Sequence, residues 1–350
     1  MAEAAPCISV LITTHNGGAL LDAAIASILT QDAVDFELIV VDDASTDDTP
    51  RRLAAHTDPR LRVLRNDRNL GVVGARNRGF AACRGAFLAT LDHDDLAAPG
   101  RLAAQYAALR NEPGLVAVAC GTAMLRDGRL VGEAQDQPLA PDALGFALHL
   151  GNPLTYSAMM LRMAALRRLD PFVRAEAELA DDYDLYHRLL ALGPMRRIAG
   201  QGCLYRWHAD NLSARRAALL DARARAILAA ALARLPGLAA SAAGLAALLI
   251  RYVSNRDVPA DAAGLRAMAA ALEQVLGAYL AAHPGVDPAP LAALAGREWW
   301  RMVAGAARAG QPGLLRLRRS APILAGGFIL GPRARAETLL VSLLRRATRR

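Results

Sequence analysis

Three carboxylates stand close together where an apolar segment of the chain stops. Residues 86–91 are mainly apolar, which predicts a buried strand, and Asp92, Asp94 and Asp95 follow at once. Asp92 and Asp94 project to the same side of an extended chain, because side chains alternate along a strand. Carboxylate oxygens in such a pair suit Mg²⁺ or Mn²⁺, especially where substrate phosphates complete the coordination shell. A solvated acidic turn is the simpler alternative for an isolated Asp-x-Asp, so the neighbouring elements must decide.

The first ninety residues alternate between predicted strands and predicted helices. The strands cover residues 7–12, 36–41, 62–65 and 86–91, and the helices between them cover 19–29, 50–55 and 72–83. This alternation indicates an α/β fold with a mostly parallel sheet and crossover helices. Ligands of such sheets bind beyond the carboxyl ends of the strands. Thr14, Asp42, Asp43 and Asp92 all stand at such ends, so we expect them to form a site.

Five short motifs, taken in order, resemble glycosyltransferase family two. They are SVLITTHN at 9–16, VVDDASTD at 40–47, NLG at 69–71, ARNRG at 75–79 and LDHDD at 91–95. The similarity extends over roughly residues 7–213. The resemblance implies a GT-A fold, a nucleotide-diphosphate sugar as donor (a UDP-sugar above all) and inversion at the anomeric centre.

The resemblance also implies roles in binding the donor. Thr14, His15 and Asn16 would meet the nucleobase and ribose, although the family more often has Tyr at the position of His15. Asp43 would contact the nucleoside, and Arg76 would lie near the nucleobase and diphosphate. A solvated helix arginine is the alternative for Arg76.

The remaining donor residues implied by the resemblance concern the metal. Asp92 and Asp94 match the motif that holds Mg²⁺ or Mn²⁺ against the diphosphate, while Asp95 orients the loop. His208 lies in a Tyr-Arg-x-His-x-x-Asn-x-Ser pattern that closes the family's catalytic domain. It is a candidate third metal ligand, since neutral imidazole binds Mn²⁺ well. A surface or core histidine is the alternative. Asp42 is either part of the nucleoside contact or a helix-capping group at the strand end.

An acceptor side and a general base are expected in the second half of this domain. The segment 152–162 resembles the family's acceptor-side strand, with Tyr156 where a histidine is frequent. Asp181 and Asp182 resemble the Glu-Asp pair that opens the last catalytic helix, with Asp181 in place of the usual Glu. Asp182 falls on the base position, where a carboxylate can take the proton of the acceptor hydroxyl. Stabilisation of a helix N-terminus is the alternative for both carboxylates.

Charge divides the 350-residue chain unevenly. The chain contains no lysine, and its basic residues are 41 arginines. Residues 1–213 carry 21 arginines and 26 acidic residues, a net charge of −5, whereas residues 214–350 carry 20 and 7, a net charge of +13. Nucleic acid is not the expected partner, because aromatic platforms and base-reading motifs are absent. An anionic membrane surface fits the basic region better.

Residues 214–350 are Ala/Leu/Arg-rich and predicted to be helical. Helical composition extends over 214–249 and 256–282, and Pro284-Gly285 and Pro288-Pro290 mark a break. Trp299 and Trp300 are either an interfacial anchor or part of a packed helix. Residues 321–330 are apolar but too few to span a bilayer. Residues 333–350 have the pattern of an amphipathic basic helix, which either binds a membrane surface or packs on the catalytic domain.

The four cysteines are dispersed and show no Cys-x-x-Cys spacing, which argues against structural zinc. The N-terminus carries Glu3 and no basic segment, so no signal peptide is expected. Both observations favour a cytoplasmic enzyme, or one held at the inner face of the cell membrane.

We therefore expect a catalytic domain over 1–213 and a basic helical region over 214–350. The predicted function is inverting, metal-dependent and non-processive sugar transfer in bacterial surface polysaccharide or glycoconjugate assembly. The acceptor would be a hydroxyl group, with a lipid-linked sugar as the candidate. Processive synthases carry a Gln before the Arg-Trp signature, and this chain has only Arg206-Trp207. A nucleotidyltransferase is one alternative, but residues 13–18 lack a basic residue for phosphate. A membrane-recruited scaffold with a degenerate site is the other.

Overall fold

The computed structural model describes residues 6–32, 35–209 and 211–309. The described residues form two compact units. Unit 1 is drawn from Met1–Leu144 and Leu154–Arg223, and unit 2 from Gly145–Pro153 and Ala224–Arg350. The chain thus leaves unit 1 for nine residues, joins unit 2, and returns. Residues 321–350, for which we predicted an apolar segment and an amphipathic helix, lie outside the described part.

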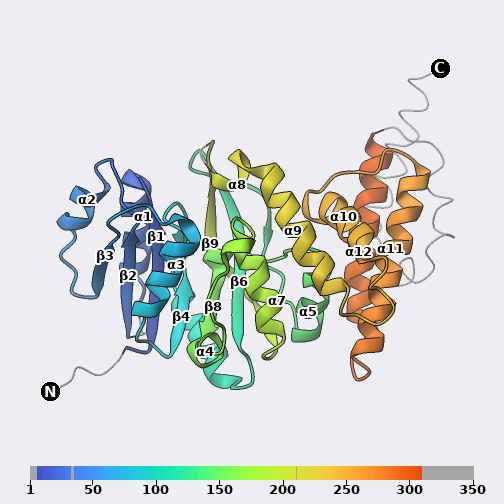
Figure 1. Ribbon diagram of the computed structural model, residues 1–350, viewed down its shortest axis with the longest axis horizontal. Helices are drawn as coiled ribbons and strands as arrows, with labels where there is room; N and C mark the ends of the chain where they lie inside the picture. The colour runs from blue at the N-terminus through green and yellow to red at the C-terminus, as the bar shows by residue number, and fades with distance from the viewer. Residues whose placement is uncertain (1–5, 33–34, 210, 310–350) are drawn as a thin grey trace. The chain divides into compact units, whose positions relative to one another are not determined.

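Unit 1 is built on a nine-stranded sheet with the order β3-β2-β1-β4-β8-β6-β9-β5, with β7 paired to β6 (Figure 1). Its strands are β1 (Ile8–Thr14), β2 (Phe36–Asp42), β3 (Leu61–Arg65), β4 (Phe87–Thr90), β5 (Leu96–Ala97), β6 (Ala117–Arg126), β7 (Arg129–Gln135), β8 (Met159–Arg162) and β9 (Met195–Trp207). The first four strands are parallel, as the sequence predicts. The predicted mixed α/β fold with a mostly parallel sheet is confirmed.

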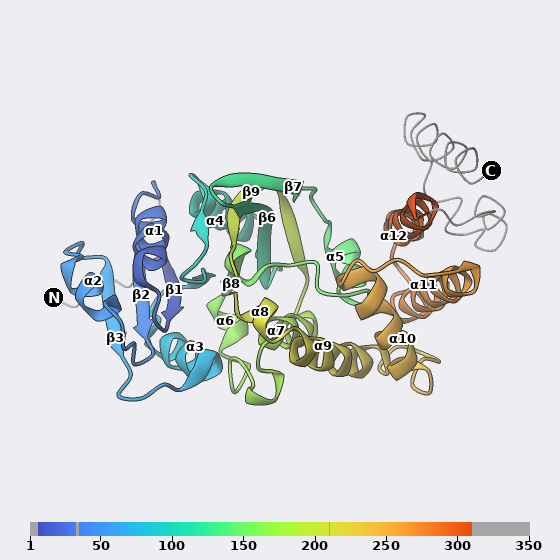
Figure 2. The same ribbon diagram turned by 90° about the horizontal axis from the view of Figure 1, so that it is seen from above.

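Helices cover both faces of this sheet. They are α1 (Gly18–Leu29), α2 (Thr49–Ala55), α3 (Gly71–Ala82), α4 (Arg101–Asn111), α5 (Pro141–Leu148), α6 (Met163–Leu166), α7 (Asp181–Leu190) and α8 (Leu212–Arg215). Figure 2 shows α1 and α3 on opposite sides of β1 and β2. Val10 and Ile12 pack in one core with Ile25 of α1, whereas Leu11 faces Gly79 of α3. Because β1 and β2 are buried on both faces, their sequences are continuously apolar.

Strand directions bring several loops to one edge of the sheet. β8 runs antiparallel to both β4 and β6, so β4 and β6 run in the same direction. β9 is parallel to β6. The carboxyl ends of β1, β2, β4, β6 and β9 therefore all lie at the same edge of unit 1, and this edge carries the site described below.

Unit 2 is helical. It contains most of α9 (Ala217–Leu232), then α10 (Ala242–Leu249), a π-helical turn over Ile250–Ser254, α11 (Ala262–Ala282) and α12 (Pro288–Arg308). The predicted helical character of residues 214–249 and 256–282 is confirmed, with residues 214–249 divided among several helices. The predicted break is found at Pro284-Gly285. Pro288 and Pro290 instead fall in the first turn of α12, where proline has no backbone bond to lose.

Trp299 is completely buried in unit 2, which makes it a core side chain and excludes the interfacial anchor for that residue. None of the helices in the described ranges is long and apolar enough to cross a membrane.

Candidate active site

Strands β1, β2 and β4 are neighbours in the sheet, and their carboxyl ends form the first part of the site. Thr14 is paired with Asp42 at the ends of β1 and β2, and the Asp43 amide donates to the Thr14 carbonyl at 2.8 Å. The Leu91 amide donates to the Leu11 carbonyl, which sets the start of the Asp92 loop beside β1. The sequence prediction that Thr14, Asp43 and Asp92 gather at one edge is therefore confirmed as geometry.

The loop after β1 is held to the loop after β2 through Asn16. Its side-chain oxygen accepts the Thr46 amide at 2.8 Å, and its own amide donates to Ser45 Oγ at 2.9 Å. Asn16 has φ +57°, the left-handed region that asparagine tolerates better than most residues. His15 Nδ1 donates to the Asp43 carbonyl at 2.8 Å. Both side chains are thus partly used to fix the loop.

Gly17 permits the tight approach of this loop to Thr14. A Cβ at Gly17 would lie 2.3 Å from Thr14 Oγ1 and 3.1 Å from the His93 ring. The Thr14 hydroxyl is buried and makes no hydrogen bond within the described residues.

Asp42 and Asp43 point to different surroundings. Asp43 Oδ1 accepts from the side chain of Asn66 at 2.5 Å and from the Leu70 amide at 2.9 Å, on the side of α3. Asp42 Oδ1 accepts the Ser45 amide at 2.9 Å, so Asp42 caps the loop after the strand rather than a helix. Asn66 had not been predicted, although its position directly after a predicted strand was a usable signal.

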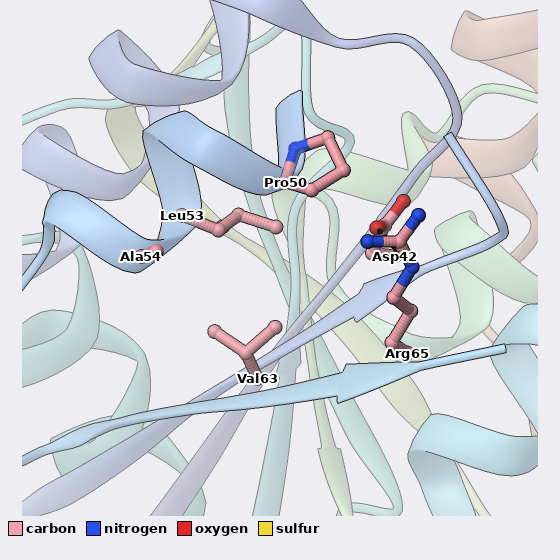
Figure 3. A pocket seen from close by; sticks show the side chains of 6 residues that line it. All are labelled: Asp42, Pro50, Leu53, Ala54, Val63 and Arg65. Carbon is pink, nitrogen blue, oxygen red and sulfur yellow. Dashed lines mark ion pairs between the residues drawn. The ribbon is translucent and has the colours of Figure 1, made fainter. Parts of the chain in front are cut away.

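The second Asp42 oxygen faces a small hollow beneath α2, of about 220 Å³, drawn in Figure 3. Arg65 Nε lies 3.6 Å from that oxygen at one end of the hollow. Leu53 of α2 and Val63 of β3 form apolar walls. The hollow lies under α2 rather than beside Asp43.

A buried arginine joins three parts of the site. Arg76 Nη1 donates to Asp181 at 2.5 Å and Nη2 donates to Asp92 at 2.9 Å. Its guanidinium lies over the Tyr156 ring, 3.5 Å from the centroid. Helix α3, the Asp92 loop, the turn at Tyr156 and helix α7 are therefore linked through one side chain. The alternative of a solvated helix arginine is wrong, since Arg76 is buried.

Burial and neighbouring charges shift the pKa values of groups in this cluster. Desolvation raises the pKa of the Asp92 carboxyl, the Arg76 guanidinium acts in the opposite direction, and the Asp94 carboxylate adds to the rise. Burial also raises the pKa of the Tyr156 hydroxyl, so this group stays neutral at physiological pH. The Asp92 amide is fixed separately by Ser157 Oγ at 2.9 Å.

Asp94 has a second set of partners from the end of β9. Its Oδ2 lies 3.1 Å from His208 Nε2 and 3.2 Å from Asn211 Nδ2. The neighbouring Asp95 is buried and accepts the Arg206 amide at 2.9 Å. Burial raises the pKa of the Asp95 carboxyl well above its usual range. Asp95 thus orients the loop, while Asp94 is turned toward His208.

The donor atoms present fit a divalent cation held in part by substrate. No three His, Cys, Asp or Glu side chains converge on one point within the described residues. The 3.1 Å between Asp94 Oδ2 and His208 Nε2 nevertheless resembles the spacing of two adjacent ligands of one ion, each at about 2.1 Å. Mg²⁺ is typically bound by one or two carboxylates, water and substrate phosphates, which this donor set allows.

Asp181 and Asp182 begin α7 in different environments. Asp181 is buried and paired with Arg76. Asp182 is only partly buried, and its Oδ1 accepts the Tyr183 amide at 2.7 Å. The predicted site residues from Thr14 to His208 thus all lie in unit 1.

The chain is similar to known proteins. The family described as Glycosyl transferase family 2 matches residues 9–164. A "Putative glycosyltransferase EpsE" of Bacillus subtilis is 31% identical over 211 residues, covering 59% of this chain and 74% of that protein. The "Succinoglycan biosynthesis protein ExoO" of Rhizobium meliloti is 44% identical over 97 residues, which is only 28% of either chain.

The fold is also found among solved structures. The crystal structure of S. aureus TarS 1-349 in complex with UDP-GlcNAc is similar with a TM-score of 0.56 and 18% identity. The match covers 91% of this chain and 89% of that one.

Proposed function

Because the chain belongs to glycosyl transferase family 2 and is a glycosyltransferase, we propose that it transfers a sugar from a UDP-sugar to an acceptor hydroxyl, with inversion and without processivity. The bridge from Asp92 through Arg76 to Asp181 carries this proposal. This bridge places the buried Arg76 guanidinium between the acidic loop after β4 and the helix that bears Asp182.

In this proposal the donor lies along the carboxyl ends of β1, β2 and β4. Asp43 contacts the nucleoside, with Thr14, His15 and Asn16 forming the rest of the nucleoside pocket. The Asp43 carboxylate is already ordered by the side-chain amide of Asn66 and the backbone amide of Leu70, so little conformational entropy is lost on binding. Arg76 faces the diphosphate, since a guanidinium recognises phosphate oxygens with paired hydrogen bonds.

We assign Asp92, Asp94 and His208 to Mn²⁺ or Mg²⁺. When bound, the ion offsets the negative charge that develops on the leaving diphosphate. Asn211 orients the Asp94 carboxylate, and Asp95 fixes the loop that carries it.

Asp182 is the proposed general base. The acceptor hydroxyl must lose its proton as its oxygen attacks the anomeric carbon, and Asp182 is the carboxylate of this pair that is not committed to Arg76. Asp181 would position Arg76, and Tyr156 would form part of the acceptor side. The stacking of Arg76 on Tyr156 would then link the acceptor side to the donor.

The proposed pathway is bacterial surface polysaccharide or glycoconjugate assembly, carried out in the cytoplasm or at the inner face of the cell membrane. ExoO is named as a succinoglycan biosynthesis protein, which supports this class of product. We propose a lipid-linked sugar as acceptor and an anionic membrane surface as a partner of the basic C-terminal region.

Thermal unfolding with a panel of UDP-, GDP- and TDP-sugars, each with and without Mn²⁺, tests the donor. We expect a UDP-sugar to raise the unfolding temperature, and the raise to depend on Mn²⁺. Hydrolysis of that donor then tests the base. Asp182→Asn should lower the turnover by about 10²–10⁴-fold while the donor still stabilises the protein.

Asp184→Asn is the matched control, since Asp184 lies in the same helix and pairs with Arg188 and Arg174. It should leave turnover unchanged. Wild-type hydrolysis by Asp182→Asn would reject the assignment of the base, and a panel without any stabilising nucleotide sugar would reject the proposed function.

A further inference from the structure

Large apolar side chains are exposed at the edge of unit 1 that carries the site. Eight such side chains are exposed among the described residues. Leu70 lies at this edge beside Asp43, and four others lie around the ends of β6 and β9. Leu130 is 61% exposed and Met124 is 41% exposed, both beside the turn between β6 and β7. Trp207 at the end of β9 is 37% exposed, and Leu212 at the start of α8 is 42% exposed. We refer to Met124, Leu130, Trp207 and Leu212 as the rim.

The topology of the sheet places the rim beside the site. Trp207 is in register with Arg126 near the end of β6 and so shares a face of the sheet with Met124. Leu130 is paired with Leu125 and lies on the other face, so the rim surrounds the tip of the hairpin from both sides. These strand ends share an edge with those of β1, β2 and β4. Figure 1 shows the end of β9 followed directly by α8 at this edge. Asn211, the residue before Leu212, contacts Asp94, so the rim begins next to the proposed metal ligands.

Arginines accompany the apolar side chains. The Arg126 guanidinium lies 4.1 Å from the centroid of the Trp207 ring. Arg129 is paired with Arg126 across the hairpin and is exposed, as is Arg215 in α8. Asp127 in the hairpin turn has its carboxylate 3.9 Å from Arg126. The apolar rim is therefore accompanied by three exposed arginines and by Asp127.

We propose that the rim is a membrane-docking surface that inserts into the interface of an anionic bilayer, with the site opening toward the lipid. Exposed apolar groups that cluster mark interaction surfaces. Tryptophan with neighbouring arginines is suited to the boundary between headgroups and acyl chains. Anionic headgroups complement the positive charge of the exposed Arg126, Arg129 and Arg215. A neutral protein surface would satisfy the apolar side chains but not this charge.

Such docking would present the site to an acceptor carried in the membrane. This surface lies in unit 1 and is distinct from the basic segment near the C-terminus, so the two can be separated by experiment. Its test requires no turnover and does not depend on the proposed reaction.

The experiment uses the full chain and vesicles of phosphatidylcholine, alone or mixed with phosphatidylglycerol. Flotation measures binding, and brominated phosphatidylcholine measures which tryptophan touches lipid, because bromine quenches emission only at short range. The chain has three tryptophans, of which Trp299 is fully buried and Trp300 partly buried. We expect binding to the anionic vesicles with quenched emission, and we expect Trp207→Phe to remove most of the quenching.

A second variant tests the apolar contribution. Met124→Ser with Leu130→Ser should weaken binding by at least about tenfold, since two apolar side chains no longer leave water. Val63→Ser with Val258→Ser is the matched control, because both valines are exposed outside the rim, and it should bind as the wild type does. Absence of binding to anionic vesicles overturns the proposal. Binding without quenching of Trp207, as attachment through the C-terminal segment alone would give, also overturns it.

Discussion

Two adjacent aspartates illustrate how environment separates residues of one type. Asp181 is buried against Arg76, which is itself held by Asp92 and stacked on Tyr156. Asp182 is partly exposed and accepts a single backbone amide from Tyr183 among the contacts described above. The first carboxylate is paired with a buried cation, whereas the second is partly exposed at the start of the same helix.

This difference predicts that the same substitution costs more stability at Asp181 than at Asp182. Asp181→Asn should lower the free energy of unfolding by about 1–3 kcal/mol, because it leaves the buried Arg76 guanidinium without full charge compensation. Asp182→Asn should cost only about 0.3–1 kcal/mol, the interaction of a carboxylate with a helix N-terminus. Urea unfolding of both variants measures this. Equal losses of stability would show that Asp182 is a structural carboxylate too.

A second prediction at this scale concerns the metal. Asp94→Asn should remove the part of the donor-induced stabilisation that depends on Mn²⁺, since the substituted amide binds a cation more weakly than a carboxylate does. His208→Ala should reduce it in part. Asp127→Asn, an exposed aspartate outside the site, is the control and should keep it. Full turnover of the wild type in excess chelator would contradict the role of the ion.

Side-chain partners are where sequence reasoning reached its limit. Strand ends pointed to Asp43 and Asp92, whereas Arg76 and Asp182 were selected through the resemblance of their motifs to the family. Residue order could not decide that Asp42 turns away from Asp43 while Arg76 is buried. Those outcomes depend on contacts with Ser45 and Asp181, and Asp181 is 105 positions from Arg76 in the chain.

At the scale of elements, close packing of α3 on the sheet sets the position of Arg76. Gly79 lies one turn after Arg76 and faces β1 and β2. A Cβ at Gly79 would lie 2.3 Å from Leu11 Cδ1 and 3.0 Å from Val41 Cγ2. Both neighbours are buried in β-strands and have little room to move. The helix can approach the sheet this closely only because residue 79 has no side chain.

Gly79→Ala should therefore destabilise unit 1 by about 1–3 kcal/mol through overpacking. It should also weaken donor-induced stabilisation, since α3 must shift and carries Arg76 with it. Gly277→Ala is the matched control in α11, where an added Cβ meets nothing within 4 Å. That variant should gain about 0.5–1 kcal/mol, the difference in helix propensity. Chemical unfolding with and without UDP and Mn²⁺ measures both effects, and a neutral Gly79→Ala would show that the sheet yields.

Local patterns predicted the elements of the parallel half well and the remainder less completely. Strands 7–12, 36–41, 62–65 and 86–91 have apolar runs with clear stops, and all appear in the structure within a few residues. Two features depend on long-range contacts, which no local pattern encodes. They are the pairing of β6 with β9 and the assignment of Gly145–Pro153 to the helical unit.

At the scale of the whole molecule, the two units should respond differently to acid. In unit 1 the Glu37 carboxylate is buried, which raises its pKa, but hydrogen bonds from Ser9, the Arg84 amide and Arg62 lower it below the ordinary 4.5. A lowered carboxyl pKa stabilises the folded state above the ordinary value, and that stabilisation is lost as pH falls below it. Glu37 therefore favours folding of unit 1 until the solution is strongly acidic.

Unit 2 depends on a neutral histidine. Burial is the main cause that lowers the pKa of His149 below the ordinary 6.5, and His283 acts in the same direction, while the Gly145 carbonyl opposes them. His149 packs against the edge of Tyr279, on which His283 is stacked. The unfolded chain takes up a proton at His149 near pH 6.5, whereas the folded chain resists it. Stability of unit 2 is thus fully present above that pH and falls below it.

We therefore predict that unit 2 weakens at a mildly acidic pH at which Glu37 remains ionised. The Trp207→Phe variant reports on unit 2 alone, because its remaining tryptophans, Trp299 and Trp300, both lie in α12. Its free energy of unfolding, measured in urea through tryptophan emission, should drop between pH 7.5 and 5.5. The slope should be at most about 1.4 kcal/mol per pH unit for one proton. His149→Gln in that background should flatten the slope, whereas His56→Gln, in unit 1, should leave it unchanged. An unaltered slope in His149→Gln would assign the acid response of unit 2 to other groups, with His283 as the first to test.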